Sequence, residues 1–542
     1  MPLSPSAHVD TFCRDHLPPL DRWPDLHFDL PELAYPARLN CAEELLDKTV
    51  RRFGADRPCL RTPSETWTYG DLLRRVDQLA WVLVEDFGLV PGNRVLLRGP
   101  NNPWLVASWL AVLKAGGVVV TTMPLLRPVE IAALVEITAP DLAVCDGRYT
   151  EDLVAAAPAL PLLTYDDELA TRCASRLEPF PAVETAADDV ALLAPTSGTT
   201  GRPKATMHFH RDVLANADTF AKYVVRPTPD DVFTGTPPIG FTFGLGGLVV
   251  FPLRVGASSL LLERAAAGEL ADAIAAHGVT VLFTAPTAYR AMLAAGRASS
   301  LRGLRRCVSA GEHLPRTVWE EFHRATGIRI IDGIGGTEML HVFISAADEE
   351  IRPGSTGRVV PGYRAAVLDA AGSPVPDGVP GRLAVTGPTG CRYLSGDRQE
   401  IYVQDGWNIT GDTYIRDADG YYWFQARSDD MIISAGYNIA GPEVEQALLG
   451  HPDVVETAVV AAPDPERGTV VQAFVVLREG AVGDAAKAVE LQAHVKAMIA
   501  PYKYPRLVEF VDSLPKTPSG KLQRFRLRET AAHRHLPPAT TA

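Results

Sequence analysis

The segment Thr196-Ser-Gly-Thr-Thr-Gly-Arg-Pro-Lys204 directly follows the apolar run Val190-Ala-Leu-Leu-Ala-Pro195. Its nine residues supply four hydroxyls, two glycines and a lysine. A strand that ends in such a loop can wrap a polyphosphate, because small residues let backbone N–H groups approach the oxygens, hydroxyls donate hydrogen bonds and lysine offsets charge. The spacing differs from the P-loop pattern, since Ala205 follows Lys204 where that pattern has Ser or Thr. The alternative is a flexible surface loop rich in Ser, Thr and Gly.

Strand-like and helix-like segments alternate on both sides of this loop. A helix is expected to start at Asn101-Asn-Pro103 and to run to Gly116. Continuous apolar runs between helices are typical of parallel sheets covered on both faces, so we expect an α/β fold. The expected strands are 94–98, 118–122, 142–145, 190–195, 279–283, 306–309 and 328–331.

The length of 542 residues predicts at least two domains. The pattern changes near Arg427-Ser-Asp-Asp430, which predicts a large N-terminal domain, 1–427, and a small mobile α+β domain, 428–542. The first 40 or so residues are expected to pack on the surface as an arm. In the small domain we expect helices at 442–449 and 485–500 and strands at 457–460 and 472–477.

The composition excludes some classes of function. The net charge is −13, from 52 basic and 65 acidic residues, which argues against broad binding to nucleic acid or to an anionic membrane. Seven widely spaced cysteines without a C-x-x-C pair favour reduced thiols and a cytoplasmic protein. The longest apolar region, 104–126, contains Lys114 and Gly116-Gly117, so it is expected to form a buried helix and strand and not a membrane span.

Five further motifs follow the opening loop in a characteristic order. With that loop, they make the chain resemble the acyl-adenylate-forming superfamily of acyl-CoA synthetases, peptide-synthetase adenylation domains and luciferases, over roughly residues 40–530. Each motif alone is moderately specific, and the six in order are very specific. The five are Ser309-Ala-Gly-Glu312, Asp332-Gly-Ile-Gly-Gly-Thr-Glu338, Thr410-Gly-Asp412, Arg427-Ser-Asp-Asp430 leading into Ser434-Ala-Gly-Tyr-Asn438, and Pro515-Lys-Thr-Pro-Ser-Gly-Lys521.

The resemblance implies a reaction in which ATP converts a carboxylate to an acyl-AMP. Both reactants are anions, so the site must supply positive charge and fixed donors around the α-phosphate. Residues 196–204 would hold the β- and γ-phosphates, and Thr337, Glu338 and Lys521 would be catalytic, with Glu338 also the ligand of Mg²⁺. The implied ATP-binding residues are Thr196, Ser197, Gly198, Thr199, Thr200, Gly201, Lys204, Gly311, Glu312, Asp332, Gly333, Ile334, Thr337, Asp412 and Arg427.

Within this set, Asp412 would accept hydrogen bonds from both ribose hydroxyls, since an ionised carboxylate only accepts. Arg427 would also approach the ribose. The adenine site departs from the family pattern, because many relatives have Tyr where this chain has Ile334. The base would then lie against Ile334 and the backbone of 309–312, with Asp332 within reach of its amino group.

The small domain would carry three further functions. Lys521 would bridge the substrate carboxylate and the α-phosphate, although a solvated basic cluster with Lys516 and Arg524 is the alternative. Asp429 resembles the hinge about which family members rotate this domain after adenylation. The residues implied for CoA are Gly436, Tyr437, Lys503 and Arg506, although the last two are as well explained as a plain surface cluster.

The acid pocket is expected to be flat, apolar and small, which favours an aromatic carboxylate over a long acyl chain. The alternative is that Phe241 and Phe243 are ordinary core residues. One residue of the pair His208 and His210 is expected to line this pocket or to hold the phosphate loop; as metal ligands the two lack a third partner. The expected pocket residues are His210, Phe241, Phe243, Gly244, Ala310, Gly335 and His341.

Several segments resemble the benzoate-CoA ligase branch, among them Asp332 to His341, Ala310 to Pro315 and Met431 to Asn438. The segments Met207 to Val213 and Ala7 to Phe12 are most similar to 2-aminobenzoate-CoA ligases. The resemblance implies an ATP- and Mg²⁺-dependent ligase that activates 2-aminobenzoate or a related benzoate as aryl-AMP. It would transfer the acyl group to CoA and release AMP and pyrophosphate.

Two other functions stay open from the sequence. An adenylating enzyme could deliver the acyl group to the pantetheine of a carrier protein. The second alternative is a catalytically silent binding protein of the same fold. The presence of Thr337, Glu338, Asp412 and Lys521 argues against this alternative. The choice between a monomer and a homodimer is open as well.

Overall fold

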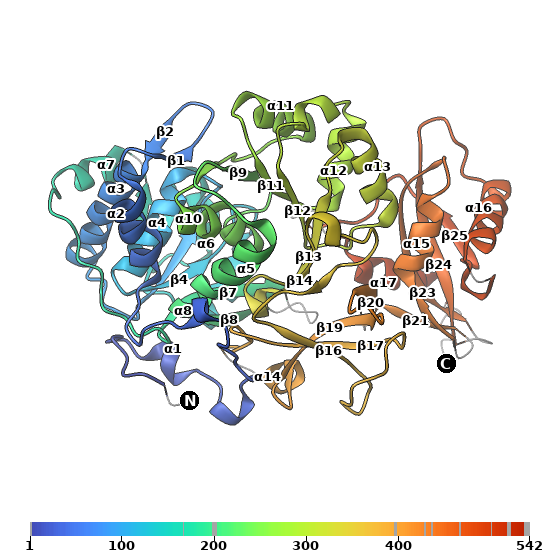
Figure 1. Ribbon diagram of the computed structural model, residues 1–542, viewed down its shortest axis with the longest axis horizontal. Coiled ribbons are helices and arrows are strands. Elements are labelled where there is room, and N and C mark those ends of the chain that lie inside the picture. Colours follow the sequence, from blue (N-terminus) through green and yellow to red (C-terminus); the bar gives the residue numbers. More distant parts are fainter. Residues whose placement is uncertain are drawn as a thin grey trace.

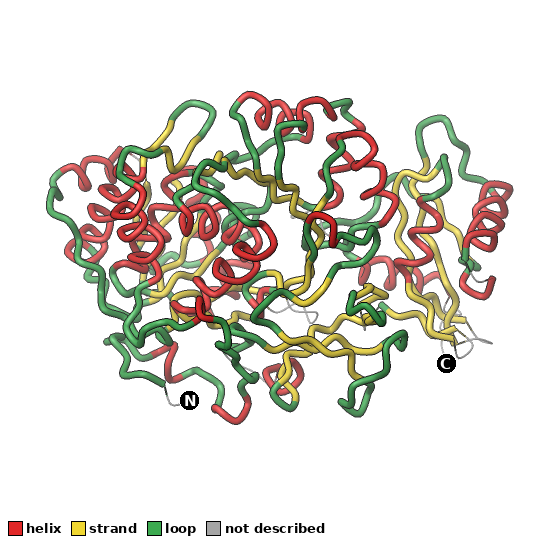
Figure 2. The backbone as a smooth tube through the Cα atoms, in the orientation of Figure 1, coloured by secondary structure: helices red, strands yellow, loops and turns green. Residues whose placement is uncertain are grey.

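A computed structural model describes residues 3–165, 167–197, 203–394, 398–427, 430–434, 437–464, 468–499, 501–517 and 522–535. Figure 1 shows a large part, coloured blue to orange, and a smaller part beside it that ends in red. In Figure 2 the strands run through the interior of the large part and most helices lie outside them. This arrangement confirms the expected fold class.

The first sheet has six strands and carries the hairpin that leads to the opening loop. Its strands are parallel except for β8, which runs antiparallel to β7. The order is β6 (Leu162–Tyr165), β5 (Leu142–Asp146), β3 (Arg94–Arg98), β4 (Val118–Thr121), β7 (Val190–Ser197) and β8 (Pro203–Phe209).

The second sheet has nine strands, and its six central strands are parallel. β13 was expected to end at 331 but runs to Gly335, because Gly333 and Ile334 pair with Ser345 and Ile344 of β14. The order is β15 (Arg358–Val359), β14 (Val342–Ser345), β13 (Ile330–Gly335), β12 (Arg306–Ser309), β11 (Val281–Thr284), β9 (Val232–Gly235), β10 (Ser258–Leu260), β1 (Pro58–Arg61) and β2 (Thr66–Thr68).

Helices cover these sheets. The helix α4 starts as expected, with Pro103 in its first turn and the Asn102 side chain accepting a 3.0 Å hydrogen bond from the Leu105 N–H. Nearly every α4 residue is buried, as expected for a helix that is apolar all round. The α-helices of the large part are α1 (Phe12–Asp15), α2 (Lys48–Phe53), α3 (Tyr69–Trp81), α4 (Pro103–Lys114), α5 (Pro128–Thr138), α6 (Thr150–Ala156), α7 (Asp167–Ala174), α8 (His210–Asn216), α9 (Thr242–Leu245), α10 (Phe251–Val255), α11 (Ala267–Ala276), α12 (Pro286–Ala294), α13 (Arg316–Thr326) and α14 (Arg398–Tyr402), and its π-helical segments are η3 (Glu43–Asp47), η4 (Val82–Asp86), η6 (Ala217–Val225) and η7 (Gly246–Val250).

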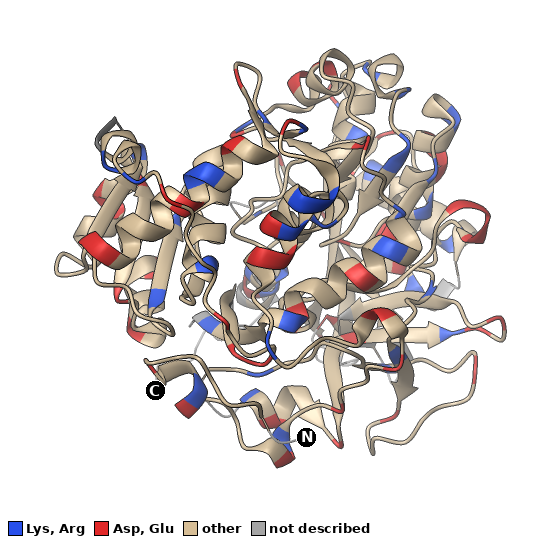
Figure 3. Ribbon diagram, turned by 60° about the vertical axis from the view of Figure 1, so that its left-hand side comes forward, with Lys and Arg blue, Asp and Glu red and all other residues tan. Residues whose placement is uncertain are grey.

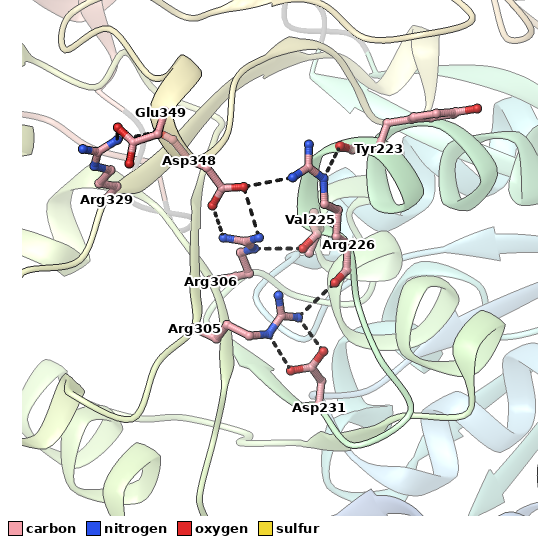
Figure 4. Close-up of polar contacts among 9 residues, drawn as sticks. All are labelled: Tyr223, Val225, Arg226, Asp231, Arg305, Arg306, Arg329, Asp348 and Glu349. Carbon is pink, nitrogen blue, oxygen red and sulfur yellow. Dashed lines mark hydrogen bonds and ion pairs between the residues drawn. The ribbon is translucent and has the colours of Figure 1, made fainter.

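A group of ion pairs lies where strands β12 and β13 of the second sheet begin (Figure 4). Asp348, in the 3₁₀ turn η10 (Asp348–Glu350), accepts from Arg306 at 2.6 Å and from Arg226 at 3.1 Å. Its backbone carbonyl accepts from Arg329 at 2.9 Å. Arg305, next to Arg306, pairs with buried Asp231 at 2.5 Å. These contacts fix the starts of β12 and β13, whose other ends reach the candidate site.

The third sheet is antiparallel and completes the large part. Its order is β16 (Arg364–Leu368), β17 (Gly381–Thr386), β19 (Trp407–Arg416) and β18 (Val403–Gln404), with β20 (Tyr422–Arg427) on the other half of β19. The N-terminal arm packs against the large part: Ala7 N–H bonds to buried Asp189 at 3.0 Å, and Asp25 N–H to Gly406 O at 2.8 Å.

The fourth sheet belongs to the smaller part and has helices on both faces. In β23, Ala458 and Val460 pack with α17, while Val459 packs with α15 and α16, as the two-residue period of a strand requires. The strands are β22 (Tyr437–Ala440), β21 (Met431–Ser434), β24 (Gly468–Leu477), β23 (Val454–Asp464) and β25 (Leu507–Phe510), and the helices α15 (Gly441–Leu449), α16 (Ala485–Met498) and α17 (Arg524–His535). The division at 427/428 stays a prediction.

Charges of both signs alternate over the ribbon in Figure 3. None of the helices in the described part of the chain combines the length and apolar character needed to cross a bilayer. All seven cysteines are buried and free of disulfide bonds.

Candidate active site

The β7–β8 hairpin supports the segment expected to hold phosphates. Thr196 and Lys204 face each other in its register, so the loop between them leaves from the end of the first sheet. Gly198, Thr199, Thr200 and Gly201 lie outside the described residues, as does the side chain of Ser197. Lys204 is half-buried, and its pKa is lowered by burial and by Arg398, while Glu338 acts in the opposite direction.

The pair Thr337 and Glu338 forms the 3₁₀ turn η9 (Thr337–Met339) immediately after β13. His208 of β8 is fully buried, and its Nε2 lies 2.8 Å from the Thr337 carbonyl, to which it donates. The hydroxyl of Tyr393 donates to Glu338 Oε1 at 2.6 Å. The hairpin and the pair that the sequence predicts to act on the α-phosphate are therefore in direct contact.

Asp332 lines a small surface hollow. Its Oδ1 is shielded from solvent and has no hydrogen-bond partner among the described residues. Burial raises the pKa of this carboxyl well above its usual range, against smaller opposite effects of the Gly333 backbone and Ser309. An acceptor oxygen without a partner can accept a hydrogen bond from a ligand N–H, such as that of an adenine amino group. The hollow is also lined by Leu314, Trp319, Ile330, Ala346, Ile351, Arg352, Gly354, Ser355 and Thr356.

The other expected nucleotide residues lie in β19, in β13 and in the segment after β12. Asp412 in β19 is nearly buried and lies opposite Arg427 of β20, whose side chain is outside the described residues. Ile334 is a half-buried residue of β13. Gly311 and Glu312 follow β12, and the φ of Gly311 is +86°, a left-handed value that favours glycine.

An aromatic cage surrounds His341, just before β14. The ring centroids of Phe251, Phe220 and Phe243 lie 4.7, 5.3 and 5.6 Å from that of His341, and Phe283 lies 6.4 Å away. Burial lowers the pKa of His341 to about 3, against a smaller effect of the Phe243 backbone. Neither ring nitrogen has a hydrogen bond of good geometry among the described residues.

Glycines allow this close packing. A Cβ on Gly246 would lie 2.4 Å from His341 Cδ2, and a Cβ on Gly335 would lie 2.4 Å from the His341 carbonyl oxygen. Phe241 caps α9, and Gly244 is buried in that helix against the carbonyl of Pro238. Ala310 is buried at the end of β12.

The place of His210 in the acid pocket stays a prediction. His210 is fully buried at the start of α8, where its Nδ1 accepts a hydrogen bond from the Cys41 N–H at 3.1 Å. Its charged neighbours are His8 and Asp189 of the arm contact, and not the cage around His341. The two histidines alternate along one segment, and sequence could not show which of them faces the site.

Tyr393 is not among the residues that the sequence predicts for the site. It lies in an irregular segment without a recognised motif, and 55 residues separate it from Glu338. The sequence shows only that Arg392 and Tyr393 are adjacent, and nothing in that pair indicates burial or a contact with Glu338.

Part of the predicted site lies outside the described residues, namely Lys521, Asp429 and Gly436. Tyr437 begins β22, but its side chain is not described. Lys503 contacts both carboxylate oxygens of Glu443 at 2.6 Å, and Arg506 donates to the Tyr504 hydroxyl at 2.9 Å. Lys503 would have to leave Glu443 in order to meet a CoA phosphate.

Glu338 suits Mg²⁺ chemically. Its carboxylate is half-buried at the end of β13, Tyr393 bonds only to Oε1, and a hard cation prefers such oxygens. When bound there, Mg²⁺ would supply positive charge to the phosphates. Among the described residues, His451, Asp453 and Glu490 also lie close together, but the Lys487 ammonium contacts both carboxylates at 2.8 and 2.7 Å. This second cluster is therefore an ion-pair network.

Two sheets that meet at the β7–β8 hairpin and η9, a third antiparallel sheet and a small C-terminal α+β part are the features of AMP-binding enzymes. The chain belongs to this family: the pattern of the AMP-binding enzyme matches residues 46–393, and that of the AMP-binding enzyme C-terminal domain matches residues 443–521. The resemblance noted in the sequence is thereby confirmed.

Similar proteins include ligases of aromatic acids. The benzoate–CoA ligase of Thauera aromatica is 33% identical over 92% of this chain and 97% of its own length. The structure of the anthranilate CoA ligase AuaEII in complex with anthranoyl-AMP superposes with a TM-score of 0.88, at 32% identity, over 93% of this chain and 99% of the other. A benzoate CoA ligase from Burkholderia xenovorans gives a TM-score of 0.83, at 32% identity, over 90% and 100%.

Proposed function

We propose that this protein is an ATP- and Mg²⁺-dependent aryl-CoA ligase, an AMP-forming acid–thiol ligase. It activates 2-aminobenzoate or a closely related benzoate as aryl-AMP and transfers the acyl group to CoA, with release of AMP and pyrophosphate. The similarity to benzoate and anthranilate CoA ligases over nearly the whole chain supports the aromatic class.

The cage around His341 is the observation that carries the choice of acid. The rings of Phe220, Phe251 and Phe283 are fully buried around His341, and Phe243 is half-buried. Phe243 is therefore the ring of this group that can face an acid, and such a wall suits a flat ring better than a flexible acyl chain. His341 lacks partners for both ring nitrogens among the described residues, although burial keeps its imidazole neutral. A neutral imidazole can accept from an amino substituent at one nitrogen and donate to an oxygen with the other.

The nucleotide roles follow the resemblance. Residues 196–204 hold the β- and γ-phosphates, Thr337 bonds the α-phosphate and Asp412 accepts from the ribose. Asp332 accepts from the adenine amino group, which its unpartnered Oδ1 supports. Lys521 bridges the acid and the α-phosphate, and rotation at Asp429 brings the CoA residues into place.

The test is ATP–pyrophosphate exchange over a panel of acids: 2-aminobenzoate, benzoate, 4-hydroxybenzoate and octanoate. We expect the highest kcat/KM with 2-aminobenzoate, and thioester formation with CoA in preference to a holo carrier protein. His341→Phe should reduce the preference for 2-aminobenzoate over benzoate about 10-fold, because an amino hydrogen bond of roughly 1.4 kcal/mol is lost.

Phe220→Leu is the matched control, since it alters the cage without removing a polar group and should leave that preference within about 2-fold. Exchange with octanoate but with none of the benzoates would show that the aryl assignment is wrong.

A further inference from the structure

We propose that Tyr393 is a positioning residue for metal-dependent adenylation, which holds the Glu338 carboxylate so that its second oxygen faces the cation. This inference rests on the proposed function, because it assigns Glu338 to Mg²⁺. The direct observation is the 2.6 Å hydrogen bond from the Tyr393 hydroxyl to Glu338 Oε1.

The backbone around Tyr393 is fixed by the first sheet. Met207 N–H donates to Arg392 O at 2.7 Å, and Leu394 N–H donates to Ala205 O at 2.9 Å. Tyr393 and Thr206 of β8 thus form an isolated antiparallel bridge. The tyrosine therefore rests on the same strand that begins near Lys204, at the phosphate loop.

Side chains fix the same segment from the other side. Gln399 accepts a hydrogen bond from Tyr393 N–H at 3.0 Å and donates to the Cys391 carbonyl at 3.1 Å. The ring of Tyr393 is only 3% exposed and meets Tyr402 edge to face, with centroids 6.1 Å apart. Because the ring is held in this way, its hydroxyl oxygen is held in place as well.

Glu338 needs such a partner because its own turn is short. The turn η9 contains three residues, and the side chain is half-buried. His208, also on β8, bonds to the carbonyl of Thr337 at 2.8 Å. Strand β8 thus holds the backbone of this pair through His208 and its carboxylate through Tyr393.

A phenol that donates to one carboxylate oxygen leaves the other to the cation and removes the rotational freedom of the group. Hydrogen bonds of this kind to metal-binding carboxylates typically change metal affinity 10- to 100-fold. Phenylalanine retains the ring and its packing, so Tyr393→Phe isolates the hydroxyl. Tyr422→Phe is the matched control, since Tyr422 is 2% exposed and its hydroxyl donates to Ala365 O at 2.9 Å.

The first measurement needs no turnover. Mn²⁺ is titrated against the protein saturated with an ATP analogue that has a methylene bridge between the α- and β-phosphorus atoms, and free Mn²⁺ is read by electron paramagnetic resonance. We expect the Kd of Mn²⁺ to rise about 10-fold in Tyr393→Phe and to stay within 2-fold of wild type in Tyr422→Phe. In a Glu338→Gln background, adding Tyr393→Phe should change the Kd less than 2-fold, because both residues act through one carboxylate.

The second measurement is the Mg²⁺ dependence of ATP–pyrophosphate exchange. Tyr393→Phe should need about 10-fold more Mg²⁺ for half-maximal rate, with the KM for the acid within 2-fold of wild type. Unchanged Mn²⁺ affinity and Mg²⁺ dependence in Tyr393→Phe would overturn the inference, as would an undiminished effect in the Glu338→Gln background. If the wild-type protein showed no ATP–pyrophosphate exchange with any benzoate, the proposed function would be wrong. The Mn²⁺ titration would still test whether Tyr393 positions the metal-binding carboxylate.

Discussion

The ion pair between Arg392 and Asp212 is the most thoroughly buried in the described part of the chain. Both side chains have zero exposure, and Arg392 donates to Asp212 Oδ2 at 2.8 Å. The guanidinium also lies 4.0 Å from the centroid of the Phe209 ring. Removing one partner of such a pair leaves the other charge without water or a counter-ion.

We therefore expect Asp212→Asn to lower the free energy of unfolding by about 3 kcal/mol, measured by urea denaturation. Asparagine keeps an acceptor for the Phe209 N–H, which donates to Asp212 at 3.0 Å. The loss of stability in this variant therefore measures the effect of removing the carboxylate charge. Adding Arg392→Met should restore much of the stability. Asp29→Asn is the control, because its pair with Arg364 is mostly exposed and should be worth less than about 1 kcal/mol. Equal losses for Asp212 and Asp29 would contradict the argument.

The sequence predicted which residues belong to the site better than it predicted which of them contact one another. It placed Thr337 and Glu338 just beyond a strand, and they form the turn η9 after β13, whereas Asp332 and Asp412 lie inside β13 and β19. It could not distinguish His208 from His210, since only the packed structure shows that one ring bonds to Thr337 and the other to Cys41. Tyr393 was invisible because its role arises from a contact across 55 residues.

The short turn η10 shows how one element can hold the edge of a sheet (Figure 4). Asp348 has a φ of +54°, a left-handed value that Asp and Asn tolerate better than Ala. Its carboxylate contacts Arg306 and Arg226, and its carbonyl contacts Arg329. Asp348 thus combines a left-handed backbone conformation with two ion pairs.

Asp348→Ala should destabilise the protein by about 2 kcal/mol, because it adds left-handed strain of roughly 1 kcal/mol to the loss of partly exposed ion pairs. Asp348→Asn keeps the favoured backbone and should cost about half as much. Guanidinium denaturation of both variants separates the two effects. Glu349→Ala serves as the control, since the Glu349 side chain is 88% exposed and, among the residues that the structure describes, it pairs only with Arg329. The same loss in Glu349→Ala and Asp348→Ala would argue against a special role of the turn.

Elements were predicted well where apolar periodicity is strong and less well at their ends. The helix α4 begins at Pro103 as expected, because the Asn102 cap is a local signal. The strand β13 continues four residues past its expected end, because its extension depends on pairing with β14, which sequence does not display.

The whole molecule should lose stability in mild acid through histidines whose pKa is lowered by burial, among them the buried His208, His210 and His341 and the half-buried His313. Burial lowers the pKa of His208, His210 and His341 to about 3 and that of His313 to about 4. The unfolded chain binds these protons near pH 6.5, whereas the folded protein does not. Stability therefore falls as the pH decreases below 6.5 and stops falling only near the folded pKa values, at a slope approaching about 1.4 kcal/mol per pH unit for each histidine.

Other groups titrate over the same range, and some act in the opposite direction: burial raises the pKa of Asp332, which favours the folded state as pH falls. The difference between wild type and a variant isolates one histidine from these groups. His341→Phe should lower stability at pH 7.5 by less, relative to wild type, than Phe220→Leu does, since phenylalanine fits the cage around it. Between pH 6.5 and 5.5 the free energy of urea unfolding should fall by about 1 kcal/mol less in His341→Phe than in wild type.

Phe220→Leu removes no titrating group, so its stability should run parallel to wild type at every pH. A His341→Phe curve that also runs parallel would show that the folded imidazole takes up its proton at the ordinary pKa. The cage would then be open to water, and the neutral, unpartnered His341 on which the choice of an amino-substituted acid depends would be lost. The same titration therefore tests a stability argument and the electrostatic basis of the pocket.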